Sequence, residues 1–541
     1  MKTEQFDFVV IGGGSAGLAV ATRLSADPGT RVALIEAGGE ADGFLVRLPA
    51  GFAQMLNDPA YDWCYLQDRD ASIGGRRFVW SAGRMLGGSS SINGQVYIRA
   101  TEADHARWVD AGCAGWSFAD CLPYFTRAEN FQGQPSPVHG RNGPISVVPL
   151  RDPHPLAQVF LDACAERGIP TLREYCGGNM DGAFLSLATQ HKGWRCGTAQ
   201  GYLPEARKRP NFAVFTNALV ERLTFDGQRA TGAIFVREGE RRTIRASREV
   251  IVCAGAIGSP ALLMRSGLGP AQHVRDQGIA VLLDRAAIGE NLQEQPTVPI
   301  NKFVNVPTYN SQMSRLHLLR HTANFYLFKK GPMATPAVQA MALARTRPDL
   351  AEPDVQFHFL PLSYDIEHET TCASTGSMPR EPTAMISASV SRPKGRGAVR
   401  LRGPHATDPP QIAHQLLGDR RDVDTLIGAC RLIESVFAAP AWQRYVTGPR
   451  DPARPDALDG QAWEDHVRTH ATIAYHPVGS CRMGSDDDAV LDPCLRVRGI
   501  DGLRVADASV LPLMPSANTN ATAIMIGERA ADFILDPGQA R

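Results

Sequence analysis

The sequence predicts an α/β protein in which a Rossmann-like domain, assembled from discontinuous segments, is joined to an α+β domain with an antiparallel sheet. Three observations carry this prediction. The chain opens with a strand, a glycine-rich turn, a helix and a second strand; two more strand–turn–helix units return far along the chain; and a long segment between them alternates apolar and polar residues. Strands that return from distant sequence to one sheet indicate a domain built from separate segments.

The bulk composition is that of an ordinary globular protein of more than one domain. The chain has 541 residues, 43% hydrophobic and 21% charged. Lys+Arg and Asp+Glu each number 56, so no bulk field would recruit nucleic acid or anionic lipid. Eleven cysteines without a CxxC pair favour a reducing compartment. The start of the chain lacks the h-region of a signal peptide, and no run reaches the roughly 18 apolar residues that span a bilayer. We therefore expect a cytoplasmic protein that binds no nucleic acid; a peripheral membrane contact stays open.

The first strand–turn–helix unit, "FDFVVIGGGSAGLAVATRLSADPGTRVALIEAGG", predicts a dinucleotide site. Gly12, Gly14 and Gly17 have the G-x-G-x-x-G spacing, which allows a tight turn, close approach of backbone to a pyrophosphate, and packing of helix on strand. Helix amides from Ser15 onward would face the phosphates. Glu36 ends the second strand, where an acid can accept hydrogen bonds from a ribose. No 2′-phosphate partner is evident, which argues against NADP; the pattern does not separate NAD from FAD.

Three later segments extend this domain. Residues 83–93, "GRMLGGSSSIN", form a second glycine loop with many small donors. Residues 248–269 and 502–535 each predict a buried strand, a turn of small residues and a helix. No second G-x-G-x-x-G follows a strand, so a single embedded cofactor is the economical interpretation.

Six motifs, in order, resemble those of the glucose-methanol-choline (GMC) flavoprotein oxidoreductase family: "GGGSAG", "GRMLGGSSSIN", "GAIGSPALLMRSGLG", "IGENLQEQP", "AYHPVGSCRMG" and "VADASVLP" with "NTNATAIMIGE". They extend from residue 12 to residue 528, essentially the whole chain. The resemblance implies an FAD-binding Rossmann-like domain interleaved with a substrate domain. We expect the FAD-binding domain at 1–150, 206–297 and 470–541, and the substrate-binding domain at 151–205 and 298–469.

The resemblance also implies the residues that hold FAD. Gly12, Gly14, Ser15 and Gly17 would hold the pyrophosphate, Glu36 the adenosine ribose, Val220 the adenine, Gly88 and Asn93 the flavin ring and pyrophosphate, and Asp507 and Ala508 the C-terminal part of the site. Some family members attach FAD covalently through a histidine in the second glycine loop. The matching residue here is Ile92, which has no nucleophile, so we expect a noncovalent flavin.

His476, in "AYHPVGSCRMG", admits three interpretations. With His466 and His470 it has the i, i+4, i+10 spacing of a zinc motif, but Val467 and Ile473 stand where that motif needs glutamate and glycine, so no metal is expected. A satisfied core histidine is a second interpretation. The third is acid–base work, to which an imidazole is suited near neutral pH. Because His476 matches the family's catalytic histidine, the resemblance favours this third role.

Asn520, the second asparagine of "NTN", is the expected partner of His476. The resemblance places it where the family carries histidine or asparagine, and an amide can orient a substrate oxygen without changing charge. Asn518 or Asn520 could instead merely cap the helix that follows. That helix would aim the positive end of its dipole at the flavin.

The substrate domain is predicted from alternating strands around "PDVQFHFLPL" and "TAMISASVSRPKGRGAVRLRG" and from an amphipathic helix after residue 418. His358 lies on one of these strands, but its face cannot be chosen from the pattern. Residues 317–331, apolar with two lysines, are expected to pack in the core, with a lid or membrane-facing segment as the alternative.

The resemblance thus implies an FAD-dependent oxidoreductase that oxidises an alcohol, expected to be primary, to the aldehyde by hydride transfer to flavin N5, with His476 as acid and base. The expected electron acceptor is quinone-like or oxygen, with a dehydrogenase preferred over an oxidase. A hydroxynitrile lyase with redox-idle FAD is an alternative within the family; an NAD-dependent reductase or a binding module is an alternative outside it. Neither the alcohol nor the oligomeric state follows from the sequence.

Overall fold

The computed structural model describes residues 3–365 and 377–536. Its first layer is a seven-stranded sheet in the order β11-β2-β1-β14-β13-β12, with β25 pairing β14. The strands are β1 (Thr3–Ile11), β2 (Val32–Ile35), β11 (Phe212–Phe215), β12 (Ala218–Asp226), β13 (Arg229–Arg237), β14 (Glu240–Val252) and β25 (Leu503–Val505). Strands β11, β2, β1, β14 and β25 are parallel neighbours, and β12 to β14 form an antiparallel meander. Three distant segments therefore build one Rossmann-like sheet, as predicted.

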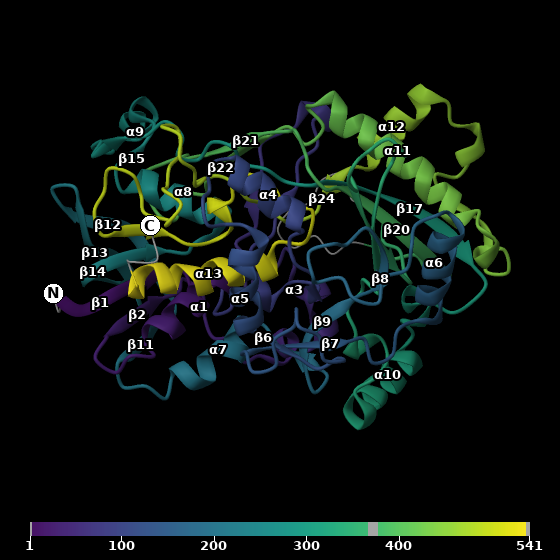
Figure 1. The fold of residues 1–541 in the computed structure, drawn as a ribbon, viewed down its shortest axis with the longest axis horizontal. Helices are drawn as coiled ribbons and strands as arrows, with labels where there is room; N and C mark the ends of the chain where they lie inside the picture. Colours follow the sequence, from purple (N-terminus) through teal and green to yellow (C-terminus); the bar gives the residue numbers. More distant parts are fainter. Residues whose placement is uncertain (1–2, 366–376, 537–541) are drawn as a thin grey trace.

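Helices α1 (Ser15–Leu24) and α13 (Asn520–Leu535) lie side by side against this sheet, although about 500 residues separate them in sequence (Figure 1). Helix α5 (Phe118–Ala128) packs on α13, and α7 (Thr198–Ala206) packs on α1. Buried Glu528 of α13 accepts hydrogen bonds from Arg23, Arg127 and Tyr202, one residue on each of the other three helices. Removing one of these partners would leave a buried charge with less compensation. The network around Glu528 therefore holds the four helices together.

The second layer, on the right in Figure 1, is an antiparallel sheet in the order β18-β19-β20-β17-β23, with β24 pairing β17. Its strands are β17 (Pro296–Val304), β18 (Ala340–Ala344), β19 (Val355–Leu360), β20 (Thr383–Val390), β23 (Val446–Asp451) and β24 (Thr472–Ile473). Three helices pack near it: α6 (Pro155–Glu166), α11 (Arg420–Phe437) and α12 (Gly460–His470). The central strands are buried along their whole length because both faces are covered. The predicted antiparallel sheet is confirmed.

A smaller sheet lies between the two layers. It contains β10 (Trp194–Arg195), β9 (Leu187–His191), β7 (Ile145–Pro149), β6 (Glu129–Phe131) and β5 (Val96–Tyr97). These strands come from both sides of the domain boundary predicted at residue 150. That boundary, like the other domain limits, stays a prediction.

Shorter elements connect these layers. They are α2 (Phe44–Arg47), α3 (Phe52–Met55), α4 (Glu102–Asp110), α8 (Gly255–Arg265), α9 (Ala271–Asp276), β8 (Gly182–Leu185) and the strand pairs β3 (Tyr65–Leu66) with β4 (Val79–Trp80), β15 (Leu268–Gly269) with β16 (Leu283–Asp284), and β21 (Gly397–Arg400) with β22 (Gln411–His414).

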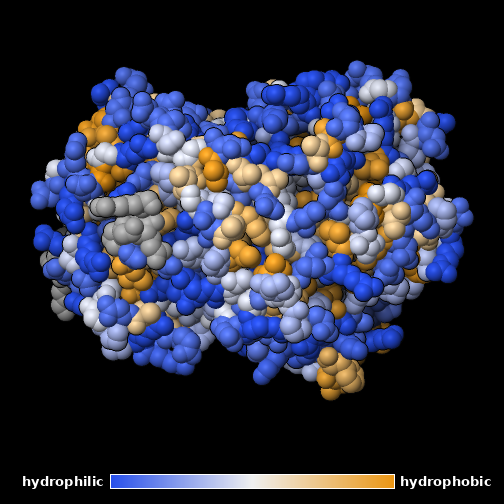
Figure 2. Space-filling model, viewed as in Figure 1, coloured by the Kyte–Doolittle hydropathy of each residue, from blue (hydrophilic) through white to orange (hydrophobic). Residues whose placement is uncertain are grey.

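The expectation that residues 317–331 pack in the core is wrong. Residues 317–328 belong to α10 (Arg315–Phe328), which projects from the molecule and buries only His321 and Phe325. Leu316, Leu327 and Phe328 are 76%, 72% and 63% exposed. The space-filling view shows apolar surface projecting at the lower edge, where α10 lies (Figure 2). Within the described residues, no helix is both long and apolar enough to cross a membrane.

Candidate functional site

The first glycine turn is fixed by close packing between β1, α1 and β14. Gly12 has φ +101°, and a Cβ there would lie 2.3 Å from the carbonyl oxygen of Cys253. A Cβ at Gly17 would lie 1.9 Å from the carbonyl oxygen of Gly12. Both positions therefore require glycine for steric reasons, as the G-x-G-x-x-G spacing predicts.

The second glycine loop lies directly on the first. Gly87 N donates to the carbonyl of Gly13 at 2.7 Å. A Cβ at Gly88 would come within 2.7 Å of Gly14 Cα, whereas a Cβ at Gly14 would meet nothing closer than 3.9 Å. The space that a Cβ of residue 14 would occupy is therefore open. We call the two turns, Gly12–Gly17 and Gly87–Gly88, the glycine cradle.

Two helix N-termini face each other at this cradle. Helix α1 begins at Ser15 and α13 begins at Asn520, and neither has a side-chain cap. Ser15 Oγ donates to Asn520 Oδ1 at 2.7 Å. Uncapped amides and the positive ends of two helix dipoles together favour an anionic group, so this point suits a dinucleotide pyrophosphate.

Glu36 lies beside the cradle at the end of β2. Its two carboxylate oxygens accept from the amides of Gly13 and Gly38, each at 2.8 Å. Burial raises the pKa of Glu36 to about 7, although those two hydrogen bonds act to lower it. Ala218 N donates to the carbonyl of Glu36, which puts the start of β12, and with it buried Val220, next to this acid.

Asp507 lies at the end of β25 and connects two helix starts. It accepts from Gly255 N at 2.9 Å, Ser259 Oγ at 2.5 Å and Ser509 N at 2.8 Å. Burial raises its pKa. Ala508 begins the turn that follows and accepts from Gly479 N. These bonds hold the histidine-bearing segment next to the C-terminal strand end.

Asn93 ends the second glycine loop and contacts a residue that sequence reasoning missed. Arg195 donates from Nη1 to both the carbonyl and Oδ1 of Asn93, at 2.7 and 2.9 Å. The Arg195 side chain is fully buried, which lowers its pKa to about 9, and its Nη2 has no partner among the described residues. A buried cation with a free donor beside this loop suits an anionic or carbonyl group of a bound cofactor. No sequence motif marked Arg195.

His476 is presented from an irregular segment with unusual backbone. The preceding Tyr475 has φ +63°, a conformation that is uncommon for a non-glycine residue. The amide of His476 donates to both oxygens of buried Glu294, at 3.1 and 2.9 Å. The ring Nδ1 lies 2.8 Å from Gln295 Oε1. Gln295 Nε2 donates to two backbone carbonyls, so its oxygen is the atom that faces His476.

These contacts fix the tautomer of His476. Nδ1 must carry the proton that it donates to Gln295 Oε1, which leaves a lone pair on Nε2. Asn518 Nδ2 lies 3.0 Å from Nε2, and Asn518 Oδ1 accepts from Gln356 Nε2 at 3.2 Å. The chain of amides therefore runs in one direction, and it presents Nε2 as a hydrogen-bond acceptor.

The structure corrects the expected partner of His476. Asn518, not Asn520, contacts Nε2, while Asn520 accepts from Ser15 in the cradle. The reason is geometric: Asn518 precedes the first turn of α13 and can turn toward the substrate domain, whereas Asn520 is the first helical residue and faces α1. The sequence did not point to Gln295 or Gln356, and it offered Asn518 only as a helix cap, because the roles of all three depend on distant segments that meet in the fold.

Burial sets the protonation of these histidines. Although the surface of His476 is only half-buried, desolvation deep among protein atoms lowers its pKa to about 3, with nearby His358 adding to the effect. Burial lowers the pKa of His358 to about 4, although the neighbouring Asn518 acts to raise it. Gln356 and His358 lie two apart on β19, so they share the face that meets His476. Glu294, in contrast, has its pKa raised to about 8 by burial.

We call Gln295, Gln356, His358, His476 and Asn518 the histidine cluster. Its side chains are neutral at pH 7 because the two imidazoles stay unprotonated and the other three are amides. The cluster can accept one proton at Nε2 of His476 and can hold an oxygen by hydrogen bonds. Such an arrangement suits removal of a hydroxyl proton from a substrate.

Comparison with known proteins finds relatives that match nearly the whole chain. Family profiles described as GMC oxidoreductase match residues 6–297 and 393–527. The oxygen-dependent choline dehydrogenase of Brucella canis is 37% identical over 532 residues, covering 98% of this chain and 95% of the relative. That of Rhizobium johnstonii is 37% identical over 541 residues, with 98% and 96% covered. The crystal structure of pyridoxine 4-oxidase from Mesorbium loti has a TM-score of 0.87 at 29% identity, with 97% and 98% covered. A formate oxidase structure, at 24% identity and TM-score 0.91, covers both chains fully and shares the fold.

Proposed function

We propose that this chain, which belongs to the GMC oxidoreductase family, uses Nε2 of His476 to take the hydroxyl proton of a neutral primary alcohol. The chain is an FAD-dependent oxidoreductase that acts on alcohols. The proposal concerns which residues carry that activity and on what kind of alcohol. The observation that supports it is the one-way amide chain that leaves a lone pair on Nε2.

The cofactor would be held by the ten residues assigned from the sequence, with Arg195 added. Gly12, Gly14, Ser15 and Gly17 would hold the pyrophosphate; Glu36 the ribose; Val220 the adenine; and Gly88, Asn93, Asp507 and Ala508 the remainder. Bound FAD supplies the acceptor for the hydride that leaves the carbinol carbon. Asn520 would serve the pyrophosphate end through its bond to Ser15.

We further propose that FAD is noncovalent. Ile92 is 2% exposed at the end of the second glycine loop and carries no nucleophile. Acid precipitation of the pure protein should leave the yellow colour in the supernatant. Colour that stays in the pellet would contradict the proposal.

In the proposed mechanism His476 acts as the base and Asn518 as the orienting group. The alcohol oxygen would lie near Nε2, where His476 accepts its proton as the C–H bond breaks. In the structure Asn518 Nδ2 donates to Nε2; when the hydroxyl of the alcohol takes its place there, the same N–H would donate to the alcohol oxygen, while Gln295 keeps the ring in the correct tautomer. Since the pKa of His476 is about 3, the base is unprotonated at neutral pH.

The cluster favours a neutral alcohol over a cationic one. Its members carry no charge, and the one acid that the described contacts bring to His476, Glu294, is buried and accepts backbone amides. A quaternary ammonium needs an aromatic cage or a carboxylate. The choline dehydrogenase relatives make this testable: choline and its uncharged isostere 3,3-dimethylbutan-1-ol can be compared in anaerobic flavin reduction. Faster bleaching by the isostere is expected; faster bleaching by choline would overturn the preference for a neutral substrate.

The electron acceptor is proposed to be a quinone reached at a membrane surface through α10. Residues 314–331 contain no acid, and exposed Arg315, Arg320 and Lys330 flank the apolar side chains of α10. A basic helix with an exposed apolar side suits the interface of an anionic bilayer. The holoenzyme should sediment with phosphatidylglycerol vesicles and lose this on Leu316→Gln/Leu327→Gln substitution. Reoxidation of the reduced flavin by a soluble quinone should outpace reoxidation by oxygen; the opposite order would indicate an oxidase.

A lyase with redox-idle FAD is separated from this function by one measurement. Anaerobic bleaching of the flavin by an alcohol panel is expected of the oxidoreductase and not of the lyase. The cytoplasmic location stays a prediction.

A further inference from the structure

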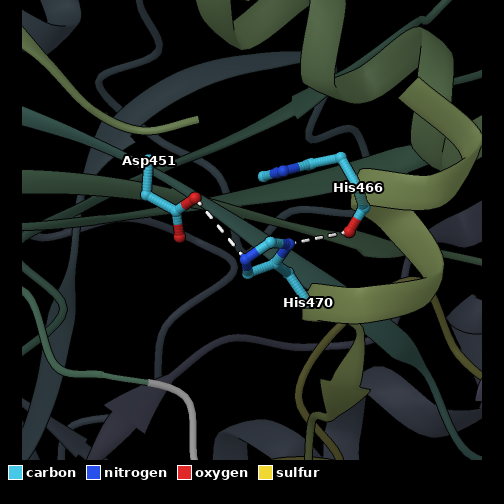
Figure 3. Close-up of side chains that lie close together, drawn as sticks. All are labelled: Asp451, His466 and His470. Carbon is cyan, nitrogen blue, oxygen red and sulfur yellow. Dashed lines mark hydrogen bonds and ion pairs between the residues drawn. The ribbon is translucent and has the colours of Figure 1, made fainter. Parts of the chain in front are cut away.

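Three metal-ligating side chains meet at a point that the alcohol chemistry does not use (Figure 3). Asp451 ends β23, and His466 and His470 lie one turn apart on α12. One donor atom from each lies within 4.8 Å of the others. His476, which shares the zinc-like spacing in sequence, is not in this group; Asp451 takes its place. We call these three residues the ligand triad.

The hydrogen bonds of His470 direct a lone pair into the triad. Its Nδ1 lies 2.9 Å from the carbonyl oxygen of His466, and because a carbonyl only accepts, Nδ1 must be the donor. In neutral His470, Nε2 then carries the lone pair, and it lies 3.5 Å from Asp451 Oδ1, itself an acceptor. Two acceptors facing each other at this distance need a proton or a cation between them.

His466 decides between a proton and a metal ion. It is 7% exposed, its Nε2 is buried, and that atom has no hydrogen-bond partner among the described residues. Figure 3 shows its ring extending toward Asp451 above the ring of His470. The two rings are stacked with centroids 4.2 Å apart. A proton shared by His470 and Asp451 would leave His466 unsatisfied, whereas a metal ion would use all three donors.

The distances also fit a metal ion. With metal–ligand bonds of about 2.1 Å, tetrahedral ligands lie about 3.4 Å apart. The His470–Asp451 pair already has this separation, and the other separations need to shorten by at most about 1.4 Å. The bond from His470 Nδ1 to a backbone carbonyl is the usual outer-shell support of a metal-bound histidine.

We propose that Asp451, His466 and His470 form a binding site for a Zn²⁺-class divalent ion. Two imidazoles and a carboxylate select zinc and its neighbours rather than Mg²⁺ or Ca²⁺, which prefer all-oxygen ligands. The ion joins α12 to β23 at the edge of the antiparallel sheet. His470 ends α12, and β24 pairs with β17 directly after it, so the ion also fixes the start of the segment that leads to His476. The site is separate from the proposed base and stabilises the fold.

The test uses FAD-loaded protein dialysed against a chelator and titrated with Zn²⁺ against a chromophoric competitor. His466→Ala, His470→Gln and Asp451→Asn are the site variants; His405→Ala, which removes an exposed histidine elsewhere, is the matched control. Flavin absorbance and circular dichroism identify variants that fold, and only those are scored. If one of the three site variants does not fold, the other two still test the site.

The expected result is one equivalent of Zn²⁺ per chain in the wild type and in His405→Ala, with a rise in Tm. His466→Ala and His470→Gln should lose more than about 100-fold in affinity, and the Tm rise should vanish with it. Mg²⁺ should not compete. Absence of a stoichiometric site in the wild type, or site variants that bind as tightly as His405→Ala, would overturn the proposal.

Discussion

Asn518 and Asn520 lie two residues apart in sequence but belong to different regions of the molecule. Asn520 accepts from Ser15 in the glycine cradle, and Asn518 contacts Nε2 of His476 in the histidine cluster. The cradle is built mainly from backbone: tight turns, close approaches and two helix N-termini. The cluster is built from amide and imidazole side chains of four distant segments.

This difference has a practical consequence. In the cradle, a side chain added to a glycine acts through steric conflict and should change cofactor retention. In the cluster, a side chain removed leaves the backbone intact and should change rate while the cofactor stays bound. Substitutions in the cradle and in the cluster should therefore separate flavin content from turnover.

The largest effect is expected for His476→Ala. The variant should purify with a full complement of flavin, because His476 makes none of the cradle contacts, but its anaerobic reduction by alcohol should slow by about 10²- to 10⁴-fold. Stopped-flow absorbance of the flavin measures this step directly. The reduction rate with dithionite, which needs no base, is the control. A variant that is reduced by alcohol at the wild-type rate would remove His476 from the proposed role.

The next effect is on the cradle. Gly17→Ala should lower the free energy of unfolding by about 1–3 kcal/mol and cost the protein its flavin, since the new Cβ would lie 1.9 Å from the carbonyl of Gly12. Gly14→Ala should fold normally, because its Cβ meets nothing closer than 3.9 Å in the protein, yet bind FAD more weakly. Thermal unfolding and flavin content of the two variants check this. Equal stability of both would show that packing does not fix the turn.

A smaller effect is expected from the two asparagines, and it should divide between the regions. Asn518→Ala should slow flavin reduction by about 10- to 100-fold with flavin content unchanged, because it removes the group that orients the substrate oxygen. Asn520→Ala should keep the rate per bound flavin and instead release FAD more readily. Rates from single-turnover reduction and FAD dissociation constants make the comparison. The reverse pattern would restore Asn520 as the partner of His476.

The two regions also differ in how far the sequence predicts them. The need for glycine at positions 12 and 17 and the place of Glu36 at the end of β2 follow from local spacing, and the Rossmann-like sheet followed from the strands around them. Asn520 was misassigned and Gln295 was missed because a side-chain amide has no sequence signature; its role depends on where β17, β19 and the segment before α13 meet. Arg195 was missed for the same reason. The exposed α10 was misjudged because apolar content alone does not tell a core helix from a projecting one.

The smallest effect concerns pH and follows from the neutral state of the cluster. The pKa of His476 is about 3, so its neutral form predominates above that value and flavin reduction should change by less than about twofold between about pH 5 and about pH 7. The lowered pKa of His476 also affects the stability of the fold. Between about pH 3 and about pH 6.5 the folded state binds fewer protons than the unfolded state, whose histidine titrates near 6.5. The contribution to the free energy of unfolding is therefore present above about pH 6.5 and is lost as pH falls toward 3.

Glu294 should set the alkaline limit instead. Its pKa, raised to about 8, lies above the unfolded value, so its contribution to stability is present below about pH 4.5 and is lost as pH rises through 8. Ionisation would place a negative charge beside the amide of His476 and change the rate there. Glu294→Gln keeps the shape of the side chain without the charge. It should remove the change in the rate of flavin reduction near pH 8 and leave the rate independent of pH between about pH 5 and about pH 7. A loss of rate as the pH of the wild type falls through about 6.5 would mean that the cluster does not keep His476 neutral, and the assignment of an uncharged cluster beside the backbone-built cradle would fail.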